Sequence, residues 1–285
     1  MKTGLFLGLA TLDLVYLTEK PPGENQKVVA SDCTIAAGGP AANAAVTFSY
    51  LGNAAVWAGV LGTHAITQLI RADLAEYNVR IIDLEPGRSH SPPVSSIIVT
   101  ETTGDRSVIS INATKSQVDS QTINRDILTS VNIVLVDGHQ IAASQEIARL
   151  ANSKNIPIVL DGGSWKPGLE EILPFVEWAV CSENFYPPEC KNSEQVFAYL
   201  SAAGISHIGI TRGEKSILYL SNGTCGHIET PQIQAADTLG AGDIFHGAFC
   251  HYILQHNFTD TLTAAAKIAS DSCKSFGTRA WMNKG

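Results

Sequence analysis

Continuous apolar runs alternate with amphipathic stretches along most of the chain. Amphipathic stretches such as 144–152 and 193–203 have the spacing of helices. Between them lie apolar runs typical of buried strands, each ending in Gly, Ser or another polar residue, at 131–138, 156–163, 176–182 and 207–213. This alternation predicts βαβ units and a mainly parallel sheet, with ligands beyond the carboxyl ends of its strands. The polar residues expected at those ends are Asp13, Asp137, Asp161 and Arg212.

Two other segments combine alternating polarity with turn residues. Residues 14–35 contain a Pro-Pro-Gly break, and residues 94–111 contain a Thr-Gly-Asp turn. Both patterns predict antiparallel hairpins, which would form a small sheet outside the main one. Such a sheet can act as a lid over the site, as a dimer interface, or as both. The length of 285 residues suits one α/β domain, residues 1–285, with these segments inserted in it.

Composition and charge exclude several classes of protein. With 45% hydrophobic and 16% charged residues, the chain has enough apolar side chains for a sizeable core. Its net charge of -8 argues against nucleic acid and against an anionic membrane surface as partners. Six cysteines without a C-x-x-C pair indicate reduced thiols. The apolar N-terminus is interrupted by Asp13, so we interpret residues 3–9 as a first strand rather than a signal peptide and expect a cytoplasmic protein.

The motif that carries chemistry is Asp-Thr-Leu-Gly-Ala-Gly-Asp at 237–243, before a helix expected from about 242 to 255. The first turn of a helix has free N–H groups, and small residues at Gly240, Ala241 and Gly242 let an anion approach them. A carboxylate at Asp243 would lie beside that anion and accept the proton of an attacking hydroxyl, an arrangement that suits phosphoryl transfer. A glycine-rich turn with a capping aspartate is the alternative. Walker A and protein-kinase signatures do not occur in the sequence.

Two weaker motifs come earlier in the chain. Gly38 and Gly39 precede an alanine-rich helix, where a substrate can lie against the backbone, and Asn43 can bond to sugar hydroxyls one turn later. Asp13 follows the expected first strand, where a carboxylate can accept two vicinal hydroxyls. Taken alone, close helix packing through alanines and simple capping explain these residues equally well.

Together the three motifs resemble those of the ribokinase-like family of carbohydrate kinases, also called the PfkB family. The 237–243 string matches the C-terminal signature of that family, and Gly-Gly-Pro-Ala-Ala-Asn-Ala-Ala after Gly-Leu-Ala-Thr-Leu-Asp matches the N-terminal one in order and spacing. Segments such as Gly-Asp-Ile-Phe-His-Gly-Ala are most similar to those of ketose kinases, namely ketohexokinase and sulfofructose kinase. The resemblance implies a three-layer α/β/α Rossmann-like domain with a β-sheet lid that often dimerises.

The resemblance also implies that ATP with Mg²⁺ phosphorylates a primary hydroxyl of a sugar. Asp243 matches the general base of the family, and Gly240, Ala241 and Gly242 match its anion hole. The sugar site implied by the matching positions comprises Asp13, Gly38, Gly39, Asn43, Arg106 and Asp243, although a solvated hairpin charge explains Arg106 equally well. The implied ATP site comprises Thr211, Arg212, Gly213, Gly240 and Gly242. A site for a monovalent cation such as K⁺ is implied at Asp237, Leu239 and Gly277.

Several positions depart from the family pattern. The N-x-x-E motif linked to Mg²⁺ would fall in 181–189, where Glu183 and Asn184 stand in altered order, so the Mg²⁺ ligands are not predicted. Thr11 replaces an asparagine of ribokinase, which counts against ribose as the substrate. The turn at 62–67 lacks its usual aspartate. Other candidates for contact with substrate or phosphate are His139 and Lys166, with solvated or packed side chains as the alternatives, whereas His246 is expected to pack on its helix.

The first hypothesis is therefore an ATP-dependent kinase that acts on a ketose-type sugar. A nucleoside kinase is the alternative within the enzyme class, because apolar residues at 92–99 would supply a pocket for the base. A sugar- or nucleotide-binding regulatory protein with weak catalysis is the alternative from another class. The altered Mg²⁺ motif favours that alternative, and the intact Gly-Ala-Gly-Asp string opposes it.

Overall fold

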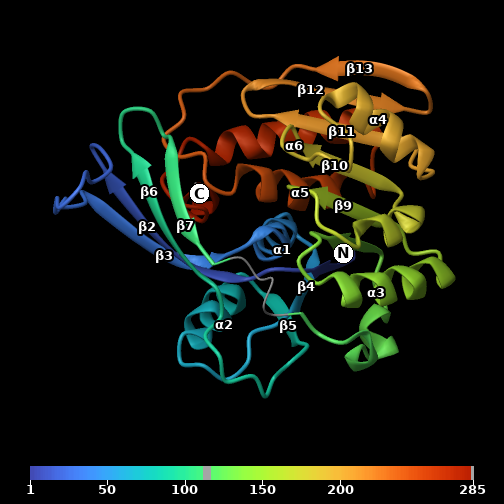
Figure 1. The fold of residues 1–285 in the computed structure, drawn as a ribbon, viewed down its shortest axis with the longest axis horizontal. Helices are drawn as coiled ribbons and strands as arrows, with labels where there is room; N and C mark the ends of the chain where they lie inside the picture. Colours follow the sequence, from blue (N-terminus) through green and yellow to red (C-terminus); the bar gives the residue numbers. More distant parts are fainter. Residues whose placement is uncertain (112–116, 284–285) are drawn as a thin grey trace.

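A nine-stranded, mainly parallel sheet forms the centre of the fold, in the order β13-β12-β11-β10-β9-β8-β1-β4-β5. The computed structural model describes residues 1–111 and 117–283 (Figure 1). The strands from β5 to β11 run parallel, and β12 and β13 add an antiparallel edge. The strands of this sheet are β1 (Thr3–Leu7), β4 (Ala54–Gly59), β5 (Val79–Asp83), β8 (Ile133–Val136), β9 (Ile158–Gly162), β10 (Trp178–Ser182), β11 (His207–Arg212), β12 (Lys215–Ser221) and β13 (Thr224–Ile228).

Helices cover both faces of this sheet, because its inner strands are apolar on both sides. In β1, Phe6 packs into one core with α1, α2, α5 and α6, whereas Leu5 and Leu7 pack into a second core with α3 and α4. The predicted three-layer α/β/α architecture is thus confirmed. The helices are α1 (Pro40–Tyr50), α2 (Thr67–Glu76), α3 (Ile141–Ser153), α4 (Ser193–Ala202), α5 (Ala241–Tyr252) and α6 (Phe258–Ser272), and short 3₁₀ turns are η2 (Ser120–Thr122), η3 (Arg125–Leu128), η4 (Leu169–Glu171), η5 (Leu173–Phe175) and η6 (Ala280–Asn283).

A second sheet of four strands stands beside the main one, in the order β3-β2-β6-β7 (Figure 1). It consists of β2 (Thr11–Thr18), β3 (Asp32–Gly38), β6 (Val94–Thr100) and β7 (Arg106–Ser110). The β2–β3 and β6–β7 pairs are antiparallel, and β2 and β6 join them in parallel. The small sheet expected outside the main one is therefore present. Its buried face holds Val15, Ile97 and Val99, which pack against Leu239 and Phe276.

Some expected boundaries are wrong. The first strand ends at Leu7 rather than residue 9, because the Leu9 N–H donates to the Asp137 carboxylate instead of to a neighbouring strand. Asp13 accordingly lies inside β2 of the second sheet, not in a loop after β1. Helix α5 spans Ala241–Tyr252 and not 242–255, because Gly240 takes a left-handed conformation (φ 70°) just before it.

The structure also bears on two expectations from the sequence, namely the lack of a membrane-spanning segment and the reduced state of the cysteines. Across residues 1–111 and 117–283, the helices are too short or too polar to cross a membrane. All six cysteines are free thiols, and Cys181, Cys250 and Cys273 are buried.

Candidate active site

The loop 237–243 is held by the buried carboxylate of Asp237. One carboxylate oxygen accepts the N–H of Leu239 at 2.8 Å and the other accepts the N–H of Gly277 at 2.9 Å. The backbone N–H groups of Ala236 and Asp237 donate to the carbonyl of Cys273. These bonds fasten the loop to the segment that follows α6, so the start of α5 has a fixed place above the carboxyl ends of the parallel strands.

The first turn of α5 forms an open cradle of backbone. A Cβ at Gly240 would lie 2.8 Å from Cγ2 of Thr278, and its left-handed φ also favours glycine. A Cβ at Gly242, in contrast, would have no heavy atom within 4 Å. The space in front of Gly242 is therefore open, and the first N–H groups of a helix point into such a space without an intrahelical acceptor. This geometry can receive an anion.

Asp243, in the same turn, lies beside the cradle. One of its carboxylate oxygens accepts a hydrogen bond of 2.8 Å from Nδ2 of Asn43, on α1. Burial raises the pKa of Asp243 to about 7, and the nearby charge of Asp161 adds to the increase; the bond from Asn43 and the positive groups of His246 and Arg106 oppose it. The carboxylate thus titrates near neutrality, as suits a group that accepts a proton and releases it.

Asp13 lies across the site on β2 and is buried. Its Oδ1 accepts a 2.6 Å hydrogen bond from the hydroxyl of Thr11, and burial raises its pKa. Gly38 must lack a side chain because a Cβ there would overlap the Asp13 carboxylate. Gly39 has φ 96° and abuts the backbone of Leu9. The two glycines make room for parts of the protein itself, which the sequence had not indicated.

Asp137 has a structural place that sequence reasoning missed. Its buried carboxylate accepts the backbone N–H groups of Leu9, Ala41 and His139, and Nδ1 of His139 lies 3.1 Å from it. Burial raises the pKa of Asp137, but the charge of His139 and these hydrogen bonds outweigh burial, and the net pKa is lowered. The carboxylate therefore ties the ends of β1 and β8 to the start of α1.

A buried pair, Asp161 on β9 and His246 on α5, lies near Asp243. His246 Nδ1 lies 2.7 Å from the carbonyl of Gly242, and Nε2 lies 3.0 Å from the carbonyl of Val180. Both partners of the ring are carbonyl acceptors, and the Asp161 carboxylate lies 3.5 Å from Nδ1. The pair attaches the first turn of α5 to the central sheet. His246 packs within the protein, as the sequence predicts.

The second sheet reaches the 237–243 loop through Arg106. Its guanidinium donates to the carbonyl of Thr238 at 2.9 Å and to the hydroxyl of Thr238 at 2.8 Å. The same hydroxyl donates to the carbonyl of Gly104, in the turn between β6 and β7. The structure thus brings Arg106 into contact with the motif loop, although its side chain remains exposed to solvent.

The residues described so far meet at one edge of the main sheet, under the second sheet. A profile of the pfkB family of carbohydrate kinases matches residues 1–284. The chain belongs to this family. The expectation of an enzyme that phosphorylates a sugar is confirmed at this level.

Individual relatives of this kinase are distant. It is 24% identical to ribokinase of Bacillus subtilis over 289 residues, which cover 99% of this chain and 96% of the relative. It is 24% identical to deoxyribokinase of Salmonella typhi over 265 residues, which cover 87% and 85%. The structure of Arabidopsis thaliana ribokinase complexed with ribose and ATP superposes with a TM-score of 0.76 at 21% identity, covering 97% and 93% of the two chains. The finer resemblance to ketose kinases stays a prediction.

The expected nucleotide loop of the kinase lies at the turn between β11 and β12. Gly213 has φ 63° and open space around it. The guanidinium of Arg212 donates to the carbonyl and the hydroxyl of Ser216, both at 2.9 Å, within the same hairpin. Thr211 accepts the N–H of Glu183 at its carbonyl. Arg212 is thus engaged by the hairpin itself, and the hydroxyl of Thr211 donates to the carbonyl of Cys181 on the neighbouring strand.

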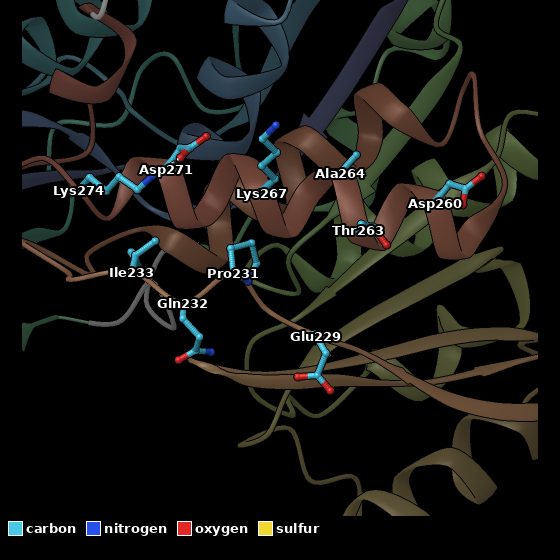
Figure 2. Close-up of a pocket in the computed structure, with 10 residues that line it drawn as sticks. All are labelled: Glu229, Pro231, Gln232, Ile233, Asp260, Thr263, Ala264, Lys267, Asp271 and Lys274. Atoms are coloured by element: carbon cyan, nitrogen blue, oxygen red, sulfur yellow. Dashed lines mark hydrogen bonds and ion pairs between the residues drawn. The ribbon is translucent and has the colours of Figure 1, made fainter.

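A hollow of about 530 Å³ lies between α6 and the segment that leads from β13 to the motif loop (Figure 2). Lys267 and Ala264 line it from α6, and Pro231 and Gln232 line it from the opposite wall. Gln232 donates to the carbonyl of Glu214 at 3.1 Å, so this wall is continuous with the β11–β12 turn. The hollow therefore adjoins the expected nucleotide loop, although the sequence did not indicate it.

Metal ligands of the kinase are not brought together in the part of the chain that the structure describes. No three His, Cys, Asp or Glu side chains among those residues form a cluster that could hold a metal ion. Each carboxylate oxygen of Asp237 accepts one backbone N–H, from Leu239 or from Gly277, and keeps capacity for a further contact, so the cation site at Asp237, Leu239 and Gly277 stays a prediction. We derive no step through K⁺.

Three more side chains lie near the site: Lys166 and His139, which the sequence offered as candidate contacts, and Arg279, which it did not. Lys166 donates to the carbonyls of Asp137 and Ser164 and to the hydroxyl of Ser164, and it contacts no carboxylate directly. His139 lies beside Asp137, as described above. Arg279, after α6, was not expected in the site, yet it donates to the side chain of Asn43.

Proposed function

We propose that this kinase transfers the γ-phosphoryl group of MgATP to a primary hydroxyl of a sugar. The observation that carries the proposal is the placement of the Asp243 carboxylate beside the open cradle at Gly242, within one helical turn. The sugar hydroxyl attacks in line while Asp243 takes its proton, and the N–H groups of the cradle stabilise the charge on the moving phosphoryl group. Mg²⁺ enters with the nucleotide as part of that substrate.

We infer that the base and ribose of the nucleotide occupy the hollow beside α6, with the phosphates running past Gly213 toward Gly242. This inference is supported by the segment that forms one wall of the hollow. Gln232 of that segment donates to the β11–β12 turn, and the segment continues along the chain into the motif loop. The charged residues that line the hollow are Lys267 and Lys274 together with Glu229, Asp260 and Asp271, and Lys274 pairs with Asp271, so we place the phosphates at the backbone cradle and not in the hollow.

For the acceptor sugar, we propose a ketose. Thr11, whose hydroxyl is bonded to Asp13, stands where ribokinase has an asparagine. Pentoses are the second candidate, because the named relatives are a ribokinase and a deoxyribokinase. A nucleoside is disfavoured, because Ile97 and Val99 pack into the core of the second sheet and are not available to line a base pocket.

The test is ADP release with MgATP over matched panels of ketoses, pentoses and nucleosides. Rapid turnover with one ketose supports the full proposal, and turnover only with ribose or deoxyribose replaces the ketose by a pentose. Binding of ATP without turnover on any alcohol would refute the kinase proposal and favour a regulatory binding protein.

Gly242→Ala tests the cradle separately from folding. Because a Cβ there has no protein atom within 4 Å, the variant folds with unchanged or slightly higher stability. The methyl group narrows the space that the phosphoryl group needs, so we expect kcat to fall by about 10-fold or more, a loss comparable to that of an anion-hole contact. Steady-state kinetics and a thermal melt check this. Unchanged kcat would show that the anion does not approach Gly242.

We also propose that the second sheet acts as a lid and that its outer face pairs with a second copy of the chain. Strand register puts Ile35, Leu14, Ser96 and Ile109 in one row on this face, and Ile35 and Ile109 are 55% and 77% exposed. The exposed Ile35 and Ile109 of two copies can bury one another in an isologous interface, whereas Leu14 of the same row already packs partly against the main core. Analytical ultracentrifugation should show a dimer that Ile109→Asp converts to monomer; a monomeric wild type at all concentrations would refute it.

A further inference from the structure

Arg279 connects its own segment with two stretches that lie far away in sequence, residues 37–43 and residues 73–77. Its guanidinium donates to Oδ1 of Asn43 at 2.8 Å and to the carbonyl of Ala37 at 2.6 Å. On its other side it forms an ion pair with Asp73 of α2, at 3.0 Å. Both side chains of this pair are nearly buried, at 11% and 14% exposed. Arg279 also lies over the ring of Tyr77, 5.4 Å from its centre.

The two neighbours of the Asn43 amide leave it only one orientation. Arg279 can only donate hydrogen bonds, and the ionised Asp243 carboxylate can only accept them. The amide therefore turns its oxygen to Arg279 and its NH₂ group to Asp243, where Nδ2 donates at 2.8 Å. Asn43 is 2% exposed, so water cannot replace either partner freely. Without Arg279, the flipped amide would set Oδ1 against the carboxylate.

We propose that Arg279 is a positioning residue of this kinase, which fixes the Asn43 amide so that its NH₂ group holds the Asp243 carboxylate in its ionised form and in the direction of the substrate hydroxyl. Asp73 in turn anchors Arg279 to α2. The inference rests on the proposed role of Asp243 as general base.

Other charged groups also face Asp243 and act on the pKa of its carboxyl. Asp161 on β9 raises the pKa of Asp243, whereas His246 on α5 and Arg106 on β7 lower it. The bond from Asn43 lowers it as well. Arg279→Gln leaves the first three groups in place. It removes the ion-pair partner of Asp73 and a positive charge that lowers the pKa of Asp13, and it releases the Asn43 amide, so the pKa of Asp243 should rise further.

The test is the titration of Asp243 in Arg279→Gln and in wild type, followed by ¹³C NMR of labelled aspartate carboxyls, with Asp243→Asn to assign the signal. We expect the midpoint to move up by about 0.5–1 pH unit, because only part of the hydrogen bond to the charged carboxylate is lost. The acid limb of kcat should move by the same amount, while KM for ATP stays unchanged. The NMR readout needs no turnover, so an inactive wild type would refute the kinase proposal, whereas an unshifted midpoint would refute the link from Arg279 to the Asp243 carboxylate.

Arg71→Gln is the matched control. Like Arg279, Arg71 forms a partly buried ion pair, with Asp83, and it lies on α2, the helix that carries Asp73. It should lower stability without moving the titration of Asp243. If Arg279→Gln does not fold, Asp73→Asn, which removes only the anchor, should shift the midpoint in the same direction by a smaller amount. The inference is overturned if Asp243 titrates in the variants with the midpoint of wild type while kcat falls by the same factor at every pH. That result would show that Arg279 has only a structural role.

Discussion

Asp243→Asn is expected to fold normally and to lose about 10²–10⁴-fold or more in kcat, because the amide cannot accept the proton of the attacking hydroxyl. The amide fits the site, since its oxygen can still accept the bond from Asn43. Binding of ATP and of sugar should change little, because the substitution keeps the shape of the side chain. Steady-state kinetics and calorimetric titration of each substrate measure the two effects. Turnover close to that of wild type would remove Asp243 from the role of base.

The same carboxylate sets the pH dependence of the wild type. With a pKa of about 7, Asp243 is mostly protonated at pH 6, so kcat/KM should be about tenfold lower at pH 6 than its plateau above pH 8. The acid limb should therefore lie near pH 7. A limb near pH 4 would mean that the carboxylate keeps an ordinary pKa.

The raised pKa also makes a prediction for stability. Between its ordinary value of 3.8 and about 7, the carboxyl is ionised in the unfolded chain but still protonated in the folded one. The folded state then binds more protons, so its stability falls as pH rises through this window. Asp243→Asn removes that loss, and we expect its melting temperature to exceed that of wild type at pH 8 by about 2–4 °C for each kcal/mol of the loss that is removed, with little difference at pH 4. The base is thus retained at a cost in stability.

Asp13→Ala should raise KM for the sugar by about 10²–10⁴-fold. A carboxylate that accepts two hydroxyl bonds contributes about 1.5–3 kcal/mol for each, and each 1.4 kcal/mol is a factor of ten. KM for ATP should stay within about twofold, because Asp13 lies on the second sheet and the proposed nucleotide hollow lies against α6. Sugar saturation curves at fixed ATP measure the change.

Two further variants make this test specific. Asp13→Asn preserves the volume and the bond from Thr11, so it should fold as wild type and still raise sugar KM by about tenfold or more. Asp105→Asn changes an exposed carboxylate in the β6–β7 turn of the same sheet and should leave both KM values unchanged. Equal sugar KM in Asp13→Asn and wild type would contradict the proposed sugar contact.

The sequence predicted the layers of the fold and the residues of the motif loop, because both depend on local pattern. Alternating apolar residues in β1 and β8 determine which side chains enter which core, and small residues at the start of α5 determine the cradle. The parallel pairing of β2 with β6 was not predicted, since no turn between them specifies it. For that reason the sequence placed Asp13 in a loop after the main sheet rather than in the second sheet.

The supporting side chains were missed because their partners are remote. Arg279 lies in a short segment after α6, without periodicity, and its contacts are with residues 206 to 242 positions earlier in the chain. Asp137 was expected at a strand end, but its bonds to Leu9 and Ala41 depend on how β1, β8 and α1 meet. The glycine pair at 38–39 was assigned to the substrate, whereas its empty space is filled by Asp13 and by the backbone of Leu9.

The hydrogen bond between Asn43 and Asp243 joins residues 200 positions apart in the chain. During synthesis, a chain that has been translated as far as β13 already contains Asp13 and Asn43 but has neither the cradle nor the base. A ribosome-bound intermediate or a proteolytic fragment that lacks α5 therefore lacks both parts of the proposed phosphoryl-transfer site. That site can form only after α5 has been made and has packed against α1.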